Sequence, residues 1–286
     1  MTKISAKLLD GFSELGIDIS LLGKYLQTIT SVKLVEELNP IIKVQTKRGE
    51  LLFSCPGSIP LWRAQTLLTK EPETIEWIDN FHDNSVFWDI GANIGIYSLY
   101  TALNESTKVF AFEPASGNYS ILNENIKNNF FDNRIRALCI AFDNHTKIEK
   151  FYMSDTKVGS SLHAFGEAID YEGKSFNPVF KQGMIGFTID NFVSIFDIPF
   201  PDYIKIDVDG NEDKILHGGL KILKNNKMKS CLIELDSNRP EYCDKVIAFL
   251  DSCNISFTEK ILQPDSDTSN GKLGIHNYIF HRRSRT

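Results

Sequence analysis

A buried strand that runs directly into a glycine turn and a helix constrains this chain more than any other feature. Residues 86–90 (VFWDI) are apolar except for Asp89, and Gly91, Asn93 and Gly95 follow in a D-x-G-x-N-x-G pattern. A continuous apolar run is typical of a parallel strand that is covered on both faces, and glycine allows a sharp turn and a close approach to a ligand. Apolar residues then recur at helical spacing, so the N-terminus of a helix is expected to face the ligand.

The same alternation continues along most of the chain. Strands are predicted at 86–90, 108–112, 135–142, 203–208 and 230–235, and helices at 94–103, 116–129, 211–224 and 240–253. Short loops between alternating strands and helices give right-handed crossovers and a parallel sheet with helices on both faces. Two further strands, at 255–260 and 276–281, are expected to close the sheet as an antiparallel hairpin. The sequence therefore predicts an α/β, Rossmann-like fold with a mostly parallel sheet of seven strands.

The glycine turn excludes one common ligand and favours another. A nicotinamide dinucleotide site has the spacing G-x-G-x-x-G, but Asn93 and Ile96 occupy the second and third glycine positions here. An acid at the strand end with this turn suits a ligand that carries an ammonium and a carboxylate and has no pyrophosphate, such as S-adenosylmethionine. Glu113 ends the next strand, where its carboxylate would accept hydrogen bonds from a ribose diol.

With these residues the chain resembles the FkbM-type family of S-adenosylmethionine-dependent methyltransferases. The resemblance rests on residues 89–95 (DIGANIG), 112–114 (FEP) with Asn118, 188–192 (TIDNF) and 201–212 (PDYIKIDVDGNE). These segments have the same order in the family and cover the chain from about residue 60 to about residue 250. The resemblance implies a class I methyltransferase fold and transfer of a methyl group to an oxygen, often a sugar hydroxyl.

Two regions fall outside the alternation of strands and helices. Residues 1–80 are expected to form an extension of short helices followed by a hairpin at 41–53. This extension would serve either as a dimerisation arm that makes a homo-oligomer or as a substrate lid. Residues 81–286 are the expected S-adenosylmethionine-binding domain. Within it, residues 147–190 are an insertion with strands predicted at 148–153, 159–162 and 184–189, and we expect this insertion to recognise the acceptor.

Ligands of open α/β sheets lie outside the carboxyl ends of the strands. Asp89 and Gly91 are therefore expected to hold the amino-acid half of the cofactor, Glu113 its ribose, and the loop 141–143 to border its adenine. Asn93 would shape the turn, and a plain turn role stays open for Asp143. The complete set of predicted cofactor-binding residues is Asp89, Gly91, Asn93, Gly95, Glu113, Pro114, Asn118 and Asp143.

Methyl transfer to an alcohol benefits from a general base because the hydroxyl has a high pKa. The predicted catalytic residues are Asp207, Asp209 and Glu212. Asp207 would be the base or position the acceptor, and the other two would raise its pKa or bind hydroxyls. For Asp209 and Glu212 the competing interpretation is that they cap the helix that begins near Asn211.

Two alternatives to this acid–base scheme remain open. Asp207 and Glu234, at adjacent strand ends, would suit Mg²⁺, which would lower the pKa of the acceptor hydroxyl directly. His163, in the loop after Gly159, is a second candidate base, although a solvated loop histidine is the simpler interpretation.

Composition narrows the partners. The net charge is −6 and the pI about 5.6, with lysines and arginines scattered among acids, so nucleic acid is not the expected partner. The five cysteines show no C-x-x-C spacing, which argues against a zinc site or a disulfide framework. No transmembrane segment or leader peptide is apparent, so we expect a cytoplasmic protein with a small-molecule or carbohydrate acceptor.

The leading hypothesis is an O-methyltransferase that acts on a hydroxyl of a sugar or glycan precursor. An O-methyltransferase of a polyketide or other small metabolite is the alternative, because the insertion is rich in aromatic residues such as Phe151 and Phe165. A non-catalytic module with this fold is the alternative from another class. An NAD-dependent oxidoreductase ranks last because the glycine spacing fails.

Overall fold

The computed structural model describes residues 24, 27–34, 38, 40–262 and 274–283. The chain divides into two compact units, Met1–Pro40 and Ile41–Thr286. Residues 27–34 are helical, and the other helices predicted in residues 1–38 lie outside the described residues. The predicted hairpin is confirmed, because β1 (Ile41–Thr46) pairs with β2 (Gly49–Ser54). It belongs to the second unit, so the domain boundary predicted at residue 80 lies inside that unit.

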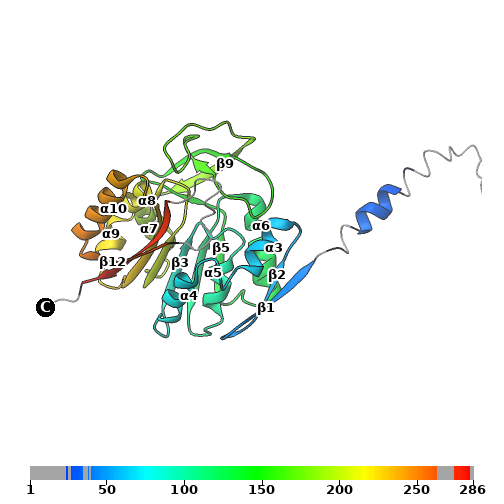
Figure 1. Cartoon of the computed structure of the whole chain (residues 1–286), viewed down its shortest axis with the longest axis horizontal. Helices are drawn as coiled ribbons and strands as arrows, with labels where there is room; N and C mark the ends of the chain where they lie inside the picture. Colours follow the sequence, from blue (N-terminus) through cyan, green and yellow to red (C-terminus); the bar gives the residue numbers. More distant parts are fainter. Residues whose placement is uncertain (1–23, 25–26, 35–37, 39, 263–273, 284–286) are drawn as a thin grey trace, which may run out of the picture. The chain divides into compact units, whose positions relative to one another are not determined.

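A seven-stranded sheet forms the centre of the second unit, with the strand order β12–β13–β11–β10–β3–β4–β5 (Figure 1). The strands are β3 (Val86–Ile90), β4 (Lys108–Phe112), β5 (Ile135–Leu138), β10 (Tyr203–Ile206), β11 (Ser230–Asp236), β12 (Ile255–Leu262) and β13 (Ile275–Arg282). Neighbouring strands from β11 to β5 are parallel, whereas β13 is antiparallel to both β11 and β12. The predicted Rossmann-like sheet with its antiparallel C-terminal hairpin is thus confirmed.

The strand order reverses between β3 and β10. From β3 the sheet continues outward through β4 and β5, and β10 lies on the other side of β3. At such a point the loops after two neighbouring strands diverge and leave a crevice in which ligands of open α/β sheets bind. Ile90 pairs with Ile206 at the ends of the two strands, so Gly91 and Asp207 come to the same crevice.

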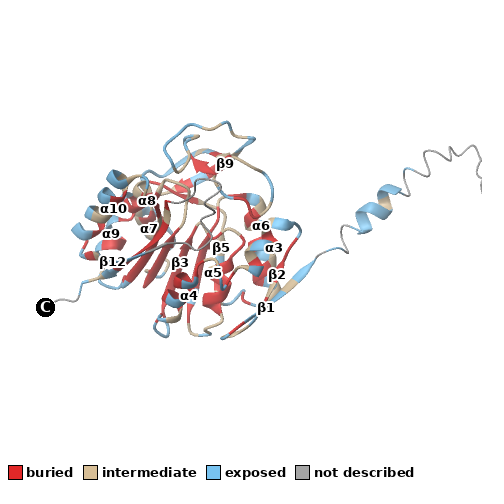
Figure 2. Ribbon diagram, in the orientation of Figure 1, coloured by how far each residue is buried: buried red, intermediate tan, exposed pale blue. Residues whose placement is uncertain are grey.

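Helices cover both faces of the sheet. They are α3 (Ser58–Gln65), α4 (Pro72–Asp79), α5 (Ile96–Ala102), α6 (Ser116–Asn128), α7 (Ile189–Phe196), α8 (Glu212–Gly218), α9 (Leu220–Lys224) and α10 (Pro240–Ser252). Successive side chains of a strand point to opposite faces. Phe87 accordingly packs with α3 to α6 and Trp88 with α7 to α10. Figure 2 shows the central strands buried along their length, as two covered faces require.

The strand predicted at 184–189 is confirmed as far as Phe187, and helix α7, which begins at Ile189, was not predicted. The Thr188 hydroxyl accepts a hydrogen bond from the N–H of Asn191 at 3.0 Å and so caps the helix. Ile189 and Phe192 are buried one turn apart and fix the helix against the sheet. Among the described residues, no helix has both the length and the apolar character needed to cross a bilayer.

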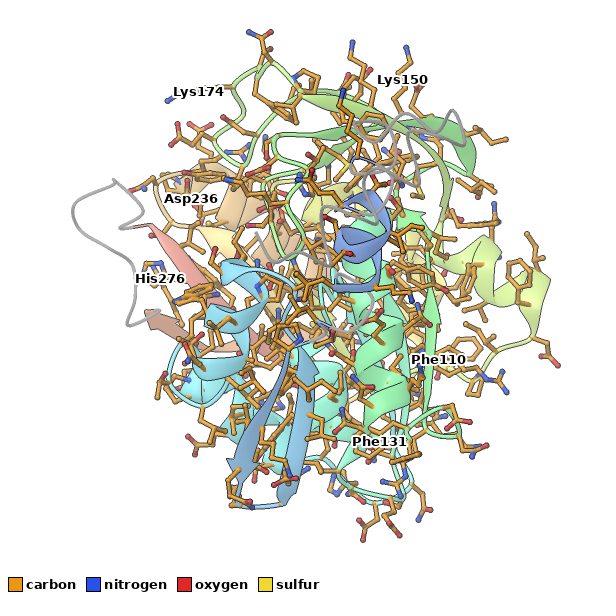
Figure 3. The ribbon with its side chains drawn as sticks, turned by 90° about the vertical axis from the view of Figure 1, so that its right-hand side faces the viewer. Phe110, Phe131, Lys150, Lys174, Asp236 and His276 are labelled. Carbon is orange, nitrogen blue, oxygen red and sulfur yellow. The ribbon has the colours of Figure 1, made fainter. Side chains whose placement is uncertain are left out.

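The insertion folds into a second, small sheet. Its strands β7 (Lys147–Met153), β8 (Ala164–Phe165) and β9 (Phe180–Phe187) are joined by β6 (Ala141–Phe142) in the order β6–β9–β7–β8. The strand predicted at 135–142 is thus divided, because β5 ends at Leu138 in the main sheet and β6 belongs to the small one. The strand predicted at 159–162 is wrong, because Gly159 and Leu162 have positive φ angles of 84° and 66° and form a loop. Figure 3 shows Lys150 and Lys174 of this insertion extending away from the body of the protein.

Candidate active site

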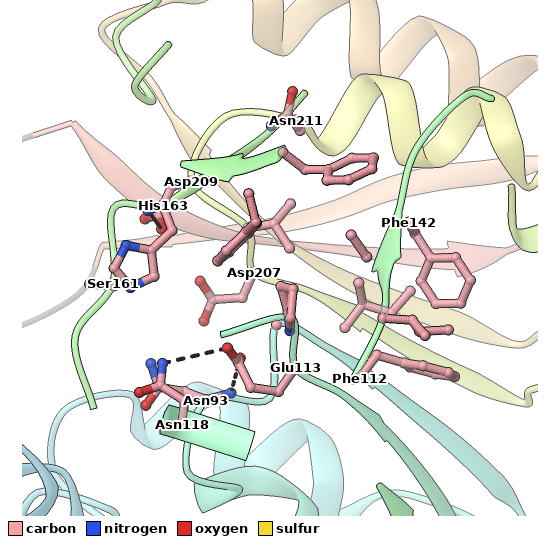
Figure 4. A pocket seen from close by; sticks show the side chains of 18 of the residues that line it. Asn93, Phe112, Glu113, Asn118, Phe142, Ser161, His163, Asp207, Asp209 and Asn211 are labelled. Carbon is pink, nitrogen blue, oxygen red and sulfur yellow. Dashed lines mark hydrogen bonds between the residues drawn. The ribbon is translucent and has the colours of Figure 1, made fainter. Parts of the chain in front are cut away.

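A cavity opens at the carboxyl ends of β3, β4 and β10 (Figure 4). Among the predicted site residues, those that line it are Gly91, Asn93, Glu113, Pro114, Asn118, Asp207 and Asp209. Asp89, Gly95, Asp143 and Glu212 are not part of this lining.

The turn after β3 requires glycine at residue 91 because of packing as well as backbone angle. Gly91 has φ 87°, and a Cβ added to it would lie 1.9 Å from the carbonyl oxygen of Asp207. The N–H groups of Gly91 and Ala92 donate to the carbonyl oxygen of Phe112 at 2.9 and 3.0 Å. The turn is thereby fixed against the ends of β4 and β10, which places Gly91 and Asn93 at the cavity.

Gly95 makes its contacts inside the protein. It precedes α5 with φ 87°, and a Cβ added there would lie 2.4 Å from Leu122 Cδ1 of α6. Glycine at this position lets α5 and α6 approach closely. Gly95 was expected to let a ligand approach the backbone, but in the structure it contacts α6 and not the cavity.

Glu113 is the acid of the predicted set that faces the cavity from β4. Its Oε2 accepts the N–H of Asn93 at 2.8 Å, and its Oε1 accepts the N–H of Ala115 at 2.8 Å and Asn118 Nδ2 at 3.5 Å. Burial raises the pKa of Glu113 to about 7, against the opposing effect of these hydrogen bonds. An ionised carboxylate has about four acceptor positions, so Glu113 still has acceptor capacity for a ligand hydroxyl.

Asn93 and Asn118 hold a loop of the insertion at the cavity. This bridging loop, residues 157–163, contributes Ser160, whose carbonyl oxygen accepts hydrogen bonds from Nδ2 of both asparagines at 3.0 Å. The N–H of Gly159 donates to Asn118 Oδ1 at 2.7 Å, and Arg63 Nε donates to the Gly159 carbonyl at 2.7 Å. The bridging loop is therefore tied to the elements that carry the predicted cofactor-binding residues.

Asp209 ties the other end of the bridging loop. Its Oδ2 accepts the N–H groups of Leu162 at 2.5 Å and His163 at 3.1 Å. Burial, followed by the nearby charge of Asp207, raises the pKa of Asp209 to about 6. Predicted as a catalytic residue, Asp209 lines the cavity but makes its hydrogen bonds to the loop backbone, which is a positioning role.

Asp207 lies at the cavity with a buried lysine behind it. Lys205 Nζ is 2.5 Å from Asp207 Oδ2, and the lysine side chain is 1% exposed whereas that of Asp207 is 28% exposed. Burial alone would lower the pKa of Lys205, but the charges of Asp207 and Glu71 outweigh burial and raise it. Lys205 is thus a permanent positive charge that fixes the Asp207 carboxylate.

Asp89 lies on the inner side of the same charged group. It is 1% exposed, pairs with Lys205 across β3 and β10, and its Oδ2 accepts the hydroxyl of Ser98 at 2.6 Å. Burial raises the pKa of Asp89 even though Lys205 opposes this shift. Its Oδ2 is therefore bonded to a protein group beneath the glycine turn, whereas its buried Oδ1 has no hydrogen-bond partner among the described residues.

The two acids predicted as alternative Mg²⁺ ligands do come together. One carboxylate oxygen each from Asp207, Glu234 and Glu71 lies within 4.8 Å of the others, and sequence reasoning missed Glu71. Two ammonium groups already bind this cluster, since Lys205 pairs with Asp207 and Lys70 Nζ lies 2.5 Å from Glu71 Oε1. These lysines already neutralise two of the three carboxylates and would compete with Mg²⁺ for them.

Asp143 and Glu212 have structural partners. Asp143 Oδ2 pairs with Lys147 Nζ at 2.7 Å, which corresponds to the turn role left open for it. Glu212 is the first residue of α8, and its two oxygens accept the Tyr242 hydroxyl at 2.7 Å and the N–H of Gly210 at 3.0 Å. Burial raises the pKa of Glu212 to about 8.

Several lining residues were not in the predicted set. They are Arg63, Ile90, Phe112, Ile140, Ala141, Phe142, Phe151, Ser160, Ser161, His163, Phe165, Val208, Asn211 and Ile215. The loop 141–143 was expected to border the adenine, and Ala141 and Phe142 of that loop do line the cavity. His163 is 9% exposed, so the expectation of a solvated histidine is wrong. The polar run Gly159-Ser160-Ser161 before it was the available signal.

Comparisons with known proteins place this site in a family context. Residues 89–257 match the model of the methyltransferase FkbM domain. No curated protein matches the chain significantly. Similar solved structures include the methyltransferase FkbM of Methylobacillus flagellatus KT, with 16% identity and a TM-score of 0.47 over 70% of this chain and 44% of that one. This chain thus spans less than half the length of that protein.

Two further structures have similar scores. Precorrin-6y C5,15-methyltransferase of Geobacter metallireducens GS-15 is 14% identical, with a TM-score of 0.45 over 77% of this chain and 93% of that one. TYW2 of M. jannaschii, solved in complex with AdoMet, is 13% identical, with a TM-score of 0.46 over 86% of this chain and 88% of that one. The FkbM domain match covers more than half of the chain and includes β3, β4 and β10 with the residues that follow them. The chain therefore has the Rossmann-like class I methyltransferase fold and belongs to the FkbM family of S-adenosylmethionine-dependent methyltransferases.

Proposed function

We propose that this chain transfers a methyl group from S-adenosylmethionine to a hydroxyl oxygen of a sugar or glycan precursor. The observation that carries the proposal is the position of Asp207, whose carboxylate faces the cavity at the switch point of the sheet while Lys205 holds it from behind. S-adenosylmethionine, when bound, supplies a methyl group on an activated sulfonium carbon. The protein then has to align the acceptor hydroxyl and receive its proton.

The residues of the cavity fit this cofactor. Glu113 presents acceptor capacity for a ribose hydroxyl, and Phe112, Ala141 and Phe142 form an apolar wall next to it. Such a wall suits the faces of an adenine ring. Gly91 packs against the backbone of Asp207, and both residues line the part of the cavity where the amino-acid half would lie.

Asp207 has the properties of a proton acceptor fixed in place. It follows β10, whose four residues are all buried, so its backbone is held by the sheet. The Lys205 ammonium on Oδ2 restricts the carboxylate to one orientation. A carboxylate at this position would accept the hydroxyl proton as the oxygen attacks the methyl carbon.

The polar part of the lining supports a carbohydrate acceptor. Ser161, His163 and Asn211 lie on the side of Asp207 and Asp209 and offer hydrogen-bonding groups (Figure 4). The aromatic pair Phe151 and Phe165 favours the alternative, an apolar metabolite hydroxyl. Both phenylalanines pack in one cluster with Ala115 and Ala141, however, which follow β4 and β5 and lie on the side expected for adenine.

Two measurements test the proposal. Calorimetry with S-adenosylhomocysteine should show binding to the wild-type chain and a loss of affinity in Glu113→Ala, whereas NAD should give no shift of the thermal midpoint. Transfer of labelled methyl groups should then be measured for two groups of acceptors. The first group holds pyranosides and sugar nucleotides, and the second holds apolar alcohols. No binding of S-adenosylhomocysteine would refute the cofactor, and methylation of the apolar alcohols alone would favour the metabolite alternative.

The role of Asp207 needs its own pair of variants. Asp207→Asn should lower kcat by about 10²–10⁴-fold and leave the affinity for S-adenosylhomocysteine within about threefold of the wild type. Asp143→Asn is the matched control, because Asp143 also follows the sheet rim but pairs with Lys147 outside the cavity. Transfer by Asp207→Asn at the wild-type rate would contradict the proposed base.

A further inference from the structure

His163 carries a buried polar atom for which the described part of the protein provides no partner. The residue lies at the end of the bridging loop, lines the cavity and is 9% exposed. Its Nε2 is buried and makes no hydrogen bond to any described residue. Buried polar side-chain atoms in native proteins nearly always have a partner, which can be a ligand.

The contacts of the other ring nitrogen determine what Nε2 can do. His163 Nδ1 accepts the backbone N–H of Ser154 at 3.3 Å. A backbone N–H only donates, so this contact favours the tautomer with a lone pair on Nδ1 and the hydrogen of the neutral ring on Nε2. Burial lowers the pKa of His163 to about 4, so the ring is neutral at pH 7.

With its hydrogen on Nε2, His163, which lines the cavity, is a hydrogen-bond donor and not the base. A base would need a free lone pair on Nε2, which requires the other tautomer and breaks the bond from Ser154. The ring is also held in place, since it packs edge-on against Phe151 with 5.7 Å between ring centroids. A fixed donor of this kind recognises an oxygen or nitrogen that carries a lone pair.

The backbone contacts of His163 place this donor on the side of the proposed base. Its N–H donates to Asp209, which follows Asp207 by two residues, and Figure 4 shows His163 and Asp209 side by side. The ribose-facing Glu113 instead takes its hydrogen bonds from Asn93, Ala115 and Asn118. The acceptor is therefore the better candidate than the ribose for the partner of Nε2.

We propose that His163 Nε2–H donates a hydrogen bond to a second oxygen of the methyl acceptor, next to the hydroxyl that is methylated. This inference rests on the proposed function and narrows its substrate class to acceptors with two neighbouring oxygens, such as a diol. A site built to hydrogen-bond a substrate group discriminates strongly against an analogue that lacks it. An alcohol with a single oxygen leaves the donor unsatisfied and is a poor acceptor.

Two substitutions separate the donor from the ring. His163→Phe keeps an aromatic ring against Phe151 but removes the donor, and His163→Gln keeps a donor. Methyl transfer is measured to a set of pyranosides and to their monodeoxy analogues. For a pyranoside that the wild type methylates, His163→Phe should raise KM by about tenfold and His163→Gln by less than about threefold. For the analogue that lacks the second oxygen, His163→Phe and the wild type should have the same KM.

The affinity for S-adenosylhomocysteine decides between acceptor and cofactor. It should remain within about threefold of the wild type in both variants, and in the control His145→Phe, which alters an exposed histidine. A larger loss of this affinity in His163→Phe would assign the donor to the cofactor and overturn the inference. An unchanged KM for every pyranoside in His163→Phe would overturn it as well.

The tautomer can be observed without any acceptor. A long-range ¹H–¹⁵N NMR spectrum should show the His163 ring with its hydrogen on Nε2 at pH 7, and its signals, identified by their absence in His163→Gln, should persist when S-adenosylhomocysteine binds. A hydrogen on Nδ1 would refute the inference even if the methyltransferase activity is as proposed. If the wild type methylates no pyranoside, the proposed function fails. The tautomer of His163 and the affinity of His163→Phe for S-adenosylhomocysteine then still decide whether the donor lies on the acceptor side or on the cofactor side.

Discussion

The affinity for the cofactor should rise with pH across neutrality because of Glu113. Burial raises the pKa of this carboxyl group to about 7, and the ionised form is the one that accepts hydrogen bonds from ribose hydroxyls. With that pKa, about one tenth of Glu113 is ionised at pH 6 and about nine tenths at pH 8. Only the ionised fraction is competent to bind, so the apparent Kd of S-adenosylhomocysteine should fall about tenfold over this range, or about 1.4 kcal/mol.

The sign of the linkage gives a second observable. The pKa of Glu113 in the folded chain lies above its ordinary value, so the group contributes stability that is present below about pH 4.5 and is lost as the pH rises through about 7. Binding of the ligand selects the ionised form and releases a proton. At pH 7 about half of the molecules are protonated, so about half a proton per ligand should appear as a dependence of the binding enthalpy on the buffer.

Calorimetry at pH 6, 7 and 8 in two buffers measures both quantities. Glu113→Gln should bind more weakly and with a Kd that no longer follows this pH dependence, whereas Asp143→Asn should retain it, because Asp143 pairs with Lys147 away from the cavity. A wild-type Kd that does not change between pH 6 and 8 would refute the reasoning. So would an equal slope in Glu113→Gln, which would assign the titration to another group.

Three further outcomes follow from the same geometry. Asp207→Asn should lower kcat by about 10²–10⁴-fold because a proton acceptor is lost, and a smaller loss in single-turnover assays would contradict its role as base. Gly95→Ala should lower the free energy of unfolding by roughly 1–3 kcal/mol in urea titrations, since the residue has φ 87° and its Cβ would lie 2.4 Å from Leu122 Cδ1. Asp209→Ala should speed amide hydrogen exchange in residues 157–163, and unchanged exchange there would show that Asp209 does not hold the bridging loop.

The main sheet was predictable from the sequence because its signals are local. Each parallel strand is rich in apolar residues, and β3, β4, β10 and β11 are each followed by a helical pattern, as at 86–102. The insertion was less predictable. Gly159 and Leu162 have positive φ angles and so cannot continue a strand. The sequence around Leu162 gives no sign of this angle, because its loop is held by the distant Asp209. Helix α7 was missed because its apolar residues also continue the strand before it.

The site was predictable to the extent that topology alone positions it. Gly91, Glu113 and Asp207 each follow or end a parallel strand next to the switch point, so their common location follows from strand order. The direction of a side chain at such a position depends on its neighbours. Asp89 ends up beneath the glycine turn because Ser98 and Lys205 are its partners there, and neither contact can be inferred from the position of Asp89 in its strand.

The acids of this rim differ in chemistry because buried carboxylates need partners. Asp143 pairs with Lys147, Glu212 binds Tyr242, and Asp209 binds a loop backbone 46 and 47 residues earlier in the chain. Each of these acids has partners that explain its burial. Glu113 and Asp207 line the cavity with acceptor capacity left for a ligand, and Asp89, beneath the glycine turn, has one buried oxygen without a partner among the described residues. A sequence pattern places acids at strand ends, but it cannot separate the structural from the chemical ones, because the separating contacts join distant segments. In this protein the insertion makes that separation. The backbone N–H groups of Leu162 and His163 in its bridging loop bind the Asp209 carboxylate, and the same contact positions the ring of His163 at the cavity.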